Sequence, residues 1–332
     1  MRGTTLNRTM TGLAMMALIG MPAGASAQGY PTKQITMISP FAAGGPSDTL
    51  ARLTADHFGR TLGQSIIIEN VGGAGGTVGT ERAARAAPDG YTIFQHHTAL
   101  PASAALYANL RYDSRTAFET VGLINTGPMV LTSRKNLDVK DAKALFAWLQ
   151  ERGDKATVAH AGIGSNSYLC ALLLMQSAGI KPALVPYRGT GPAMIDIVSG
   201  QVDVLCDQAT TATSQVEAGT IKAYAVTSSE RLPAIKDVPS AKEAGLVGFD
   251  MVIWNGLYAP KGTPKPIIDA LHGALQKFLD DPKIVEQFAK TGTVPFGKDM
   301  RSPDAHQKLL TSEFDRFATM IKAAGVKVQE AK

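Results

Sequence analysis

The residues best placed to do chemistry in this 332-residue chain lie in two short segments of the same design. Each segment joins an expected strand to a turn rich in glycine, and a helix begins directly after the turn. The first is Phe41-Ala42-Ala43-Gly44-Gly45-Pro46-Ser47-Asp48, and the second is Gly162-Ile163-Gly164-Ser165-Asn166-Ser167. Ligands of open α/β sheets gather outside the carboxyl ends of strands, so two such segments predict a shared ligand site.

These segments allow an anion to be bound by backbone groups. The first N–H groups of a helix have no partner inside the helix, and the peptide dipoles add a partial positive charge there. Glycine lets the backbone approach a ligand closely and adopt positive φ. We expect the amide of Ser165 to be a main contact. A simpler interpretation is that Ser47, Asp48, Ser165 and Asn166 only cap their own helices, and the sequence leaves both interpretations open.

Enzyme motifs fit the chain poorly. The glycine-rich stretch 70–79 has Val78 where a dinucleotide-binding fingerprint needs glycine, and no phosphate-binding loop ending in Gly-Lys-Ser/Thr occurs. Ser165 lacks the Gly-x-Ser-x-Gly frame of a hydrolase, so a pair with His160 rests on sequence proximity alone. A secreted hydrolase using Ser165 or Asp48 stays as an alternative. No Cys/His spacing resembles a metal site, and we expect neither metal nor cofactor.

Strands and helices alternate along most of the chain, which predicts an α/β fold with parallel sheets built from βαβ units. Strands are expected at 33–39, 65–69, 91–95, 157–161, 183–187, 202–206, 221–226 and 252–258. Helices are expected at 48–62, 80–86 and 165–178, between Pro192 and Gly200, and from near Pro266, Pro282 and Pro303. His96 and His97 follow the third of these strands. Their side chains should point to opposite faces, and the sequence does not decide which one faces a cleft.

The length predicts two domains, because so long a chain exceeds what one core usually holds. The three final helices are expected to pack back on the first domain. We therefore predict a discontinuous domain 1 of residues 28–126 and 229–332, and a domain 2 of residues 127–228. The ligand cleft should lie between them.

The N-terminus has the pattern of a signal peptide. Arg2 and Arg8 precede an apolar run from Met10 to Met21, and Ala25-Ser26-Ala27 supplies the small residues of a cleavage site. The run is shorter than the roughly 20 residues that span a bilayer. We expect residues 1–27 to be removed after Ala27 and the mature protein to reach the periplasm. The formal net charge of +5 is too mild to indicate nucleic-acid binding.

The chain has two cysteines, Cys170 and Cys206. An oxidising compartment permits a disulfide without requiring one. Both cysteines lie in apolar contexts, so two buried thiols are the favoured prediction and a disulfide is the alternative.

Four stretches carry a family resemblance, in order and with similar spacing. They are YPTKQITMISPFAAGGPSDTLAR, ENVGGAGGTVGTERAARAAPDGYT, VPYRGTGPAMIDIVSGQVDVLCDQ and WNGLYAPKGTPKP. From about Tyr30 to the C-terminal helices the chain resembles the Bug-type (TctC-like) extracytoplasmic receptors of tripartite tricarboxylate transporters. The resemblance implies a two-domain, type II-like periplasmic binding fold that closes on an organic acid.

The resemblance also implies site residues. Those of the first wall would be Phe41, Ala42, Gly44, Gly45, Ser47 and Asp48, and those of the second wall Gly162, Gly164, Ser165 and Asn166. Asp207 would be a further cleft residue, and His96 resembles a histidine of one branch. Many members carry Gly-Thr-His where this chain has Thr98-Ala99-Leu100, so Thr98 joins the candidates.

Together these features predict a monomeric, non-enzymatic receptor that delivers a di- or tricarboxylate to integral membrane subunits of a tripartite tricarboxylate-type transporter. The change at 98–100 suggests an aromatic dicarboxylate such as terephthalate. Besides the hydrolase, the remaining alternative is a sensor that presents its ligand-bound form to a membrane kinase.

Overall fold

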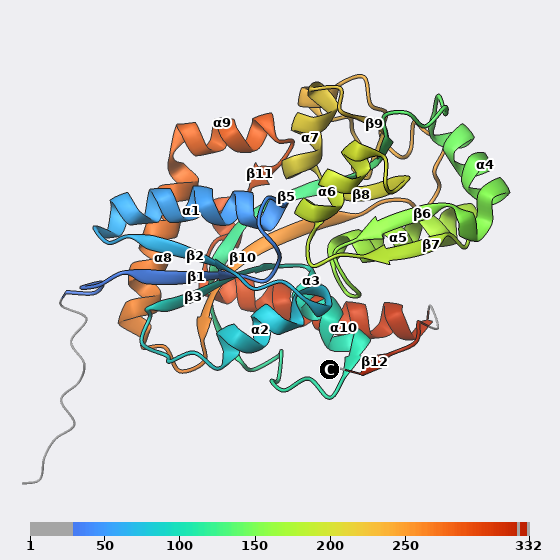
Figure 1. The fold of residues 1–332 in the computed structure, drawn as a ribbon. Coiled ribbons are helices and arrows are strands. Elements are labelled where there is room, and N and C mark those ends of the chain that lie inside the picture. Colours follow the sequence, from blue (N-terminus) through green and yellow to red (C-terminus); the bar gives the residue numbers. More distant parts are fainter. Residues whose placement is uncertain (1–28, 324–325, 331–332) are drawn as a thin grey trace, which may run out of the picture.

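The computed structural model describes residues 29–323 and 326–330, so the predicted signal peptide, residues 1–27, lies outside the described residues. The chain forms two α/β lobes around a long mixed sheet (Figure 1). The main path of that sheet has the strand order β2-β1-β3-β10-β5-β8-β6-β7. Among the described helices, none is long and apolar enough to cross a membrane.

The first lobe is built on three parallel strands, β1 (Ile35–Ser39), β2 (Ile66–Asn70) and β3 (Thr92–His97). Helices cover both faces of this part of the sheet, because successive side chains point to opposite faces and most of those of β1 and β3 are buried. One face packs on α1 (Pro46–Leu62), α8 (Lys265–Asp280) and α9 (Pro282–Lys290). The other packs on α2 (Thr77–Ala84), α3 (Ala99–Leu106) and α10 (Pro303–Ala323).

The second lobe repeats this plan with the parallel strands β6 (Thr157–His160), β7 (Ala183–Pro186) and β8 (Val204–Gln208). Its largest core cluster joins the sheet to α4 (Ala142–Arg152) and α5 (Asn166–Ala178). Further clusters hold α6 (Thr190–Ser199) and α7 (Ala209–Glu217) against the sheet. The helix ends follow local signals, since α5 and α6 stop at Gly179 and Gly200, both in the left-handed conformation.

Two long strands connect the lobes. β5 (Phe118–Arg134) pairs with β10 (Val252–Pro260) up to Pro128, and with β8 and β9 (Ile221–Val226) from Met129 onwards. Every one of these pairings is antiparallel, as is that of β10 with β3. The prediction of parallel sheets is therefore wrong for the strands that join the lobes. A chain that passes from one lobe to the other and returns needs strands running in opposite directions.

The core clusters bear on where the lobes divide. Leu246 and Phe249 pack in the same cluster as Leu145 and Leu174 of the second lobe. The predicted division at 126 and 228 stays a prediction, and this packing favours a return crossing at the start of β10 rather than at residue 228.

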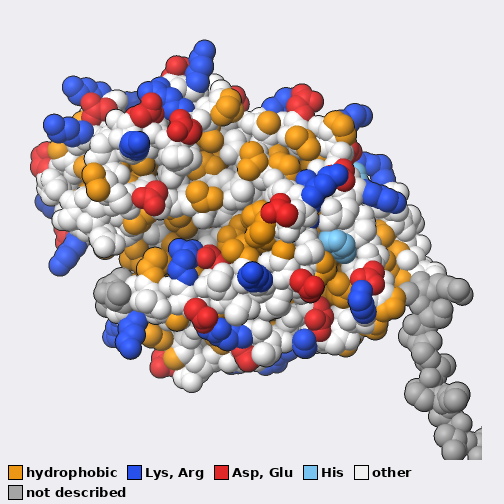
Figure 2. Space-filling view, turned by 180° about the vertical axis from the view of Figure 1, so that it is seen from behind, with side chains coloured by type: hydrophobic (Ala, Val, Ile, Leu, Met, Phe, Trp, Pro, Cys, Tyr) orange, Lys and Arg blue, Asp and Glu red, His pale blue; other side chains and the backbone are white. Residues whose placement is uncertain are grey.

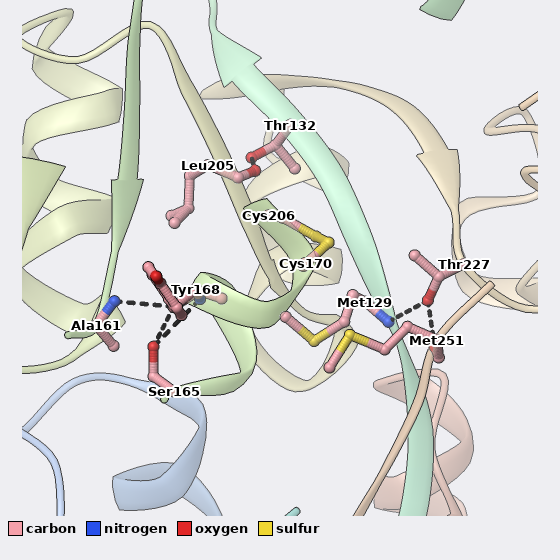
Figure 3. The surroundings of a disulfide bond; sticks show 11 residues. Met129, Thr132, Ala161, Ser165, Tyr168, Cys170, Leu205, Cys206, Thr227 and Met251 are labelled. Carbon is pink, nitrogen blue, oxygen red and sulfur yellow. Dashed lines mark hydrogen bonds between the residues drawn. A yellow bond between two sulfur atoms is a disulfide. The ribbon is translucent and has the colours of Figure 1, made fainter. Parts of the chain in front are cut away.

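A disulfide joins Cys170 of α5 to Cys206 of β8, with Cα atoms 6.1 Å apart (Figure 3). The prediction of two free thiols is therefore wrong. The helix and the strand lie side by side in one core, which the sequence separation of 36 residues does not reveal. Seen from behind, the surface carries Lys and Arg interspersed with Asp and Glu, and hydrophobic side chains gather in the middle of the face (Figure 2).

Candidate ligand-binding site

A small cavity lies where the two lobes meet. The helix starts of four strand-turn-helix units lie around it. The starts of α1 and α5 face it from opposite lobes, and the starts of α6 and α7 join them. Its lining residues are Phe41, Gly45, Pro46, Ser47, His97, Met129, Ala161, Ser165, Asn166, Ser167, Thr190, Asp207 and Gln208. The parallel strands β6, β7 and β8 end at one edge of the second lobe. β1 of the first lobe runs in the opposite direction, so the carboxyl ends of the strands of both lobes meet at the cavity.

Three residues of the predicted first wall, Phe41, Gly45 and Ser47, line the cavity. Ser47 lies in the first turn of α1, where a backbone N–H has no acceptor inside the helix. The other three do not line it. Asp48 accepts hydrogen bonds from the Gly44 N–H and from Arg52, and the Ala42 N–H donates to the carbonyl of Arg188. These contacts hold the turn rather than offering donors to a ligand.

In the predicted second wall, Ser165 and Asn166 line the cavity, whereas Gly162 and Gly164 form the turn behind them. The two glycines have φ of 99° and 87°, a conformation that other residues rarely adopt. The Ser165 N–H donates to the Gly162 carbonyl at 3.1 Å. The expectation that this amide faces a ligand is therefore wrong. The amides of Asn166 and Ser167, in the first turn of α5, have no acceptor inside the helix and are therefore the better candidates.

Of the paired histidines, His97 lines the cavity and His96 does not. The Ala99 N–H donates to His97 Nδ1 at 3.1 Å, which places the proton of the neutral ring on Nε2. Burial lowers the pKa of His97 to about 3, so the ring stays a neutral hydrogen-bond donor at neutral pH. The Phe41 ring stacks on it, with centroids 5.0 Å apart. Thr98 lies outside the cavity, and its hydroxyl accepts a hydrogen bond from the Trp254 N–H.

Asp207 lies at the end of β8 and lines the cavity with only 1% of its surface exposed. Sequence reasoning missed several of its neighbours, among them Met129, Thr190 and Gln208. Thr190 and Gln208 stand where α6 and α7 begin, so the rule that selected the two glycine-rich turns could have found them. Met129 carries no such signal, because it lies inside a strand that the sequence pattern did not predict.

Several buried polar atoms that line the cavity have no hydrogen-bond partner within the described part of the chain. They are both amide atoms of Asn166, the Thr190 hydroxyl and Asp207 Oδ1. An unpaired buried polar group costs about 1–3 kcal/mol, so a ligand or a water molecule that bonds to these atoms in the cavity would be stabilised. The arrangement is suited to a small, polar and negatively charged molecule, held by helix starts and neutral donors.

The lobes touch through backbone around this cavity. The bond from the Ala42 N–H to the Arg188 carbonyl, 3.0 Å long, crosses between them, as does one of 3.1 Å from the Tyr107 hydroxyl to the Ile163 carbonyl. A Cβ atom added to Gly189 would lie 2.8 Å from the Ala42 nitrogen. Glycine is therefore required here because two backbones meet directly.

Comparison with known proteins agrees with this geometry. Residues 50–326 match the family model described as the tripartite tricarboxylate transporter family receptor. The chain belongs to this family. A curated member from Agrobacterium vitis, the UPF0065 protein of the TAR-I ttuE-ttuC' intergenic region, is 44% identical over 89% of this chain and 86% of its own length. BugT of Bordetella pertussis is 30% identical over 95% of this chain and 96% of its own length.

Solved structures of the family have the same fold as this receptor. The periplasmic binding protein BugD is 41% identical, with a TM-score of 0.87 over 91% of this chain and all of BugD. MatC of Rhodopseudomonas palustris, solved with malate, is 40% identical with a TM-score of 0.84, over 88% of this chain and 100% of MatC. Another R. palustris protein, solved with adipate, is 30% identical with a TM-score of 0.84, over 91% of this chain and 100% of its own. The first of these relatives is a periplasmic binding protein, and the other two were solved with an organic acid.

The hydrolase alternative finds little support in the receptor's geometry. The Ser165 hydroxyl donates to the Gly162 carbonyl at 2.6 Å and accepts from the Tyr168 N–H at 3.2 Å. His160 Nδ1 accepts from the Gly162 N–H instead of pairing with Ser165. A nucleophilic serine needs a base within hydrogen-bond reach, and none pairs with this hydroxyl in residues 29–323 and 326–330.

Proposed function

We propose that the protein is a periplasmic receptor that captures a small di- or tricarboxylate between its lobes and delivers it to the membrane subunits of a tripartite tricarboxylate-type transporter. The observation that carries this proposal is the meeting of helix starts from both lobes at one cavity whose buried polar atoms lack partners. The relatives solved with malate and adipate support an organic acid as the ligand class.

Capture needs no covalent step. A ligand carboxylate that accepts from the first-turn amides of α1 and α5 touches both lobes, so it binds the closed arrangement more tightly than an open one. Closure removes water from the site and strengthens these hydrogen bonds. Delivery then requires the lobes to separate, which breaks the bond from Ala42 to Arg188.

Two finer features belong to the proposal. The stacked rings of Phe41 and His97 give one wall of the cavity a flat aromatic surface, so an aromatic dicarboxylate such as terephthalate is a second ligand class. The N-terminal pattern of Arg2, Arg8 and Ala25-Ser26-Ala27 supports export to the periplasm with cleavage after Ala27. The proposed receptor acts as a monomer.

The test is a thermal-shift screen of the mature protein with mono-, di- and tricarboxylates, both aliphatic and aromatic. A ligand at 100 times its dissociation constant adds about 2.7 kcal/mol of stability, which is a readily measured rise in Tm. Failure of every acid in the panel to raise Tm refutes carboxylate capture.

Two further measurements separate this proposal from its alternatives. Incubation with ester, amide and phosphoester panels should give no turnover above buffer, whereas turnover that disappears in Ser165→Ala would support the hydrolase. Deleting the gene should abolish uptake of the ligand that the screen identifies. Unchanged uptake with a lost transcriptional response would support the membrane-kinase sensor instead.

A further inference from the structure

Asp207 stands out among the groups that would surround a bound acid. Of the described residues that line the cavity, it is the one carboxylate, and none is a lysine or arginine. The other titratable group there is His97, a neutral donor. A site for anions therefore contains a buried acid with no basic side chain beside it.

The two oxygens of this carboxyl group differ. Oδ2 accepts a hydrogen bond of 2.6 Å from the Thr211 hydroxyl in the first turn of α7. Oδ1 is buried and accepts no hydrogen bond of good geometry from the residues described, although the Thr190 hydroxyl and the Gln208 N–H lie close to the carboxyl group. The hydrogen bond from Thr211 fixes the orientation of the Asp207 carboxyl group, and Oδ1 can accept a hydrogen bond from a ligand in the cavity.

A simple dicarboxylate cannot satisfy that oxygen. Its carboxylates only accept hydrogen bonds, and a negative charge close to buried Asp207 is repelled, so such an acid can bind but less tightly than one that carries a donor. An acid with a hydroxyl or ammonium group next to its carboxylate differs in this respect. Its carboxylate can accept hydrogen bonds from the first-turn amides of α5, while the neighbouring hydroxyl or ammonium group donates one to Asp207 Oδ1.

On this basis, and assuming the proposed function, we propose that Asp207 Oδ1 selects acids that carry a hydrogen-bond donor, a hydroxyl or an ammonium, on the carbon beside a carboxylate. Burial raises the pKa of Asp207, whereas the Thr211 hydroxyl, the Thr190 hydroxyl and the Gln208 N–H all oppose that rise, and a bound donor would oppose it further. A charge-assisted hydrogen bond of this kind corresponds to about 10-fold to 100-fold in affinity.

The experiment compares three four-carbon acids that differ only in one group: succinate, L-malate and L-aspartate. Calorimetry at pH 7.5 should show malate or aspartate binding about 10-fold to 100-fold more tightly than succinate. In Asp207→Asn this preference should shrink by about 10-fold, with aspartate losing most because its ammonium loses a counter-charge. Asp138→Asn is the matched control, since Asp138 is exposed and lies outside the cavity.

The outcomes separate this inference from the proposed function. Equal binding of all three acids to the wild type overturns the role of Asp207 and leaves carboxylate capture intact. A second result would also overturn the role of Asp207 and leave carboxylate capture intact. In it, succinate binds the wild type more tightly as the pH falls from 8 to 5 but binds Asp207→Asn equally at both pH values, because Asp207 then acts as a protonated donor. If no acid of the larger screen binds, the proposed function itself fails. A preference that survives in Asp207→Asn assigns the selection to another residue.

Discussion

Gly189→Ala should weaken ligand binding without weakening the fold. Gly189 lies directly before α6, and its backbone faces the Ala42 nitrogen of the other lobe. A methyl group there would lie 2.8 Å from that nitrogen and 3.2 Å from the Ala42 side chain. The three nearest atoms to the added carbon all belong to Ala42, so the clash exists only while the lobes are closed.

The magnitude follows from the size of this overlap. Ordinary contact begins near 3.4 Å, so the lobes must separate by roughly half an ångström at this point, and the hydrogen bond from Ala42 to Arg188 stretches from its 3.0 Å. Overpacking of this kind costs about 1–3 kcal/mol. Because the cost falls on the closed arrangement alone, the dissociation constant should rise by roughly 5-fold to about 100-fold.

Calorimetry gives the affinity, and small-angle scattering gives the degree of closure with and without ligand. Gly273→Ala is the control, because a Cβ atom there meets nothing within 4 Å. Both variants should keep the wild-type Tm or exceed it when no ligand is present. A Gly189→Ala protein that binds as tightly as the wild type would mean that the lobes are farther apart in the ligand-bound form, and the reasoning from direct backbone contact would be refuted.

Three further predictions follow from buried groups. Asn166→Ala should raise the stability of the ligand-free protein, since it removes two unpaired buried atoms, and should lower ligand affinity by about 10-fold to 100-fold. Urea titration measures the stability and calorimetry the affinity, and Asn136→Ala, at an exposed position, should change neither. Unchanged affinity in Asn166→Ala would exclude Asn166 from the site. Cys170→Ala with Cys206→Ala should lower the free energy of unfolding by about 4 kcal/mol, because the disulfide closes a loop of 36 residues, and equal urea midpoints for both proteins would contradict it. Burial lowers the pKa values of five described histidines, to about 3 for His97 and His306, well below 6.5 for His96, and below 6.5 for His57 and His160. Stability is therefore full above about pH 6.5 and falls as the unfolded chain takes up protons, by up to about 2 kcal/mol at pH 5 for a histidine whose pKa is near 3. Urea midpoints measured from pH 7 to pH 5 should show this fall, it should be smaller in His306→Gln, and a flat profile would refute it.

Much of the secondary structure was predictable because its signals are local. The expected helix at 165–178 and the observed α5 at Asn166–Ala178 differ by one residue, since Ser165 caps the start and Gly179 the end. β5 was missed, although it spans 17 residues. Its sequence mixes glycine and proline with apolar residues, and only its four partner strands give it an extended form.

The candidate site was predictable in kind and less so in detail. Glycine-rich turns before helices pointed to Ser47, Ser165 and Asn166, all of which line the cavity. The choice between His96 and His97 depended on which face of β3 meets the cavity, and no local signal records that. No local signal records the disulfide either, because the packing of the lobe sets the distance between α5 and β8.

The sequence by itself determined the repeated strand-turn-helix units, since proline, glycine and capping residues act on the backbone within a few positions of themselves. Only the tertiary structure decided that four of these units share one cavity, that Asp207 lies among them, and that Gly189 meets Ala42. Such contacts join residues more than a hundred positions apart. They depend on how β5 and β10 join the strands of the two lobes into one sheet, which no short stretch of sequence specifies.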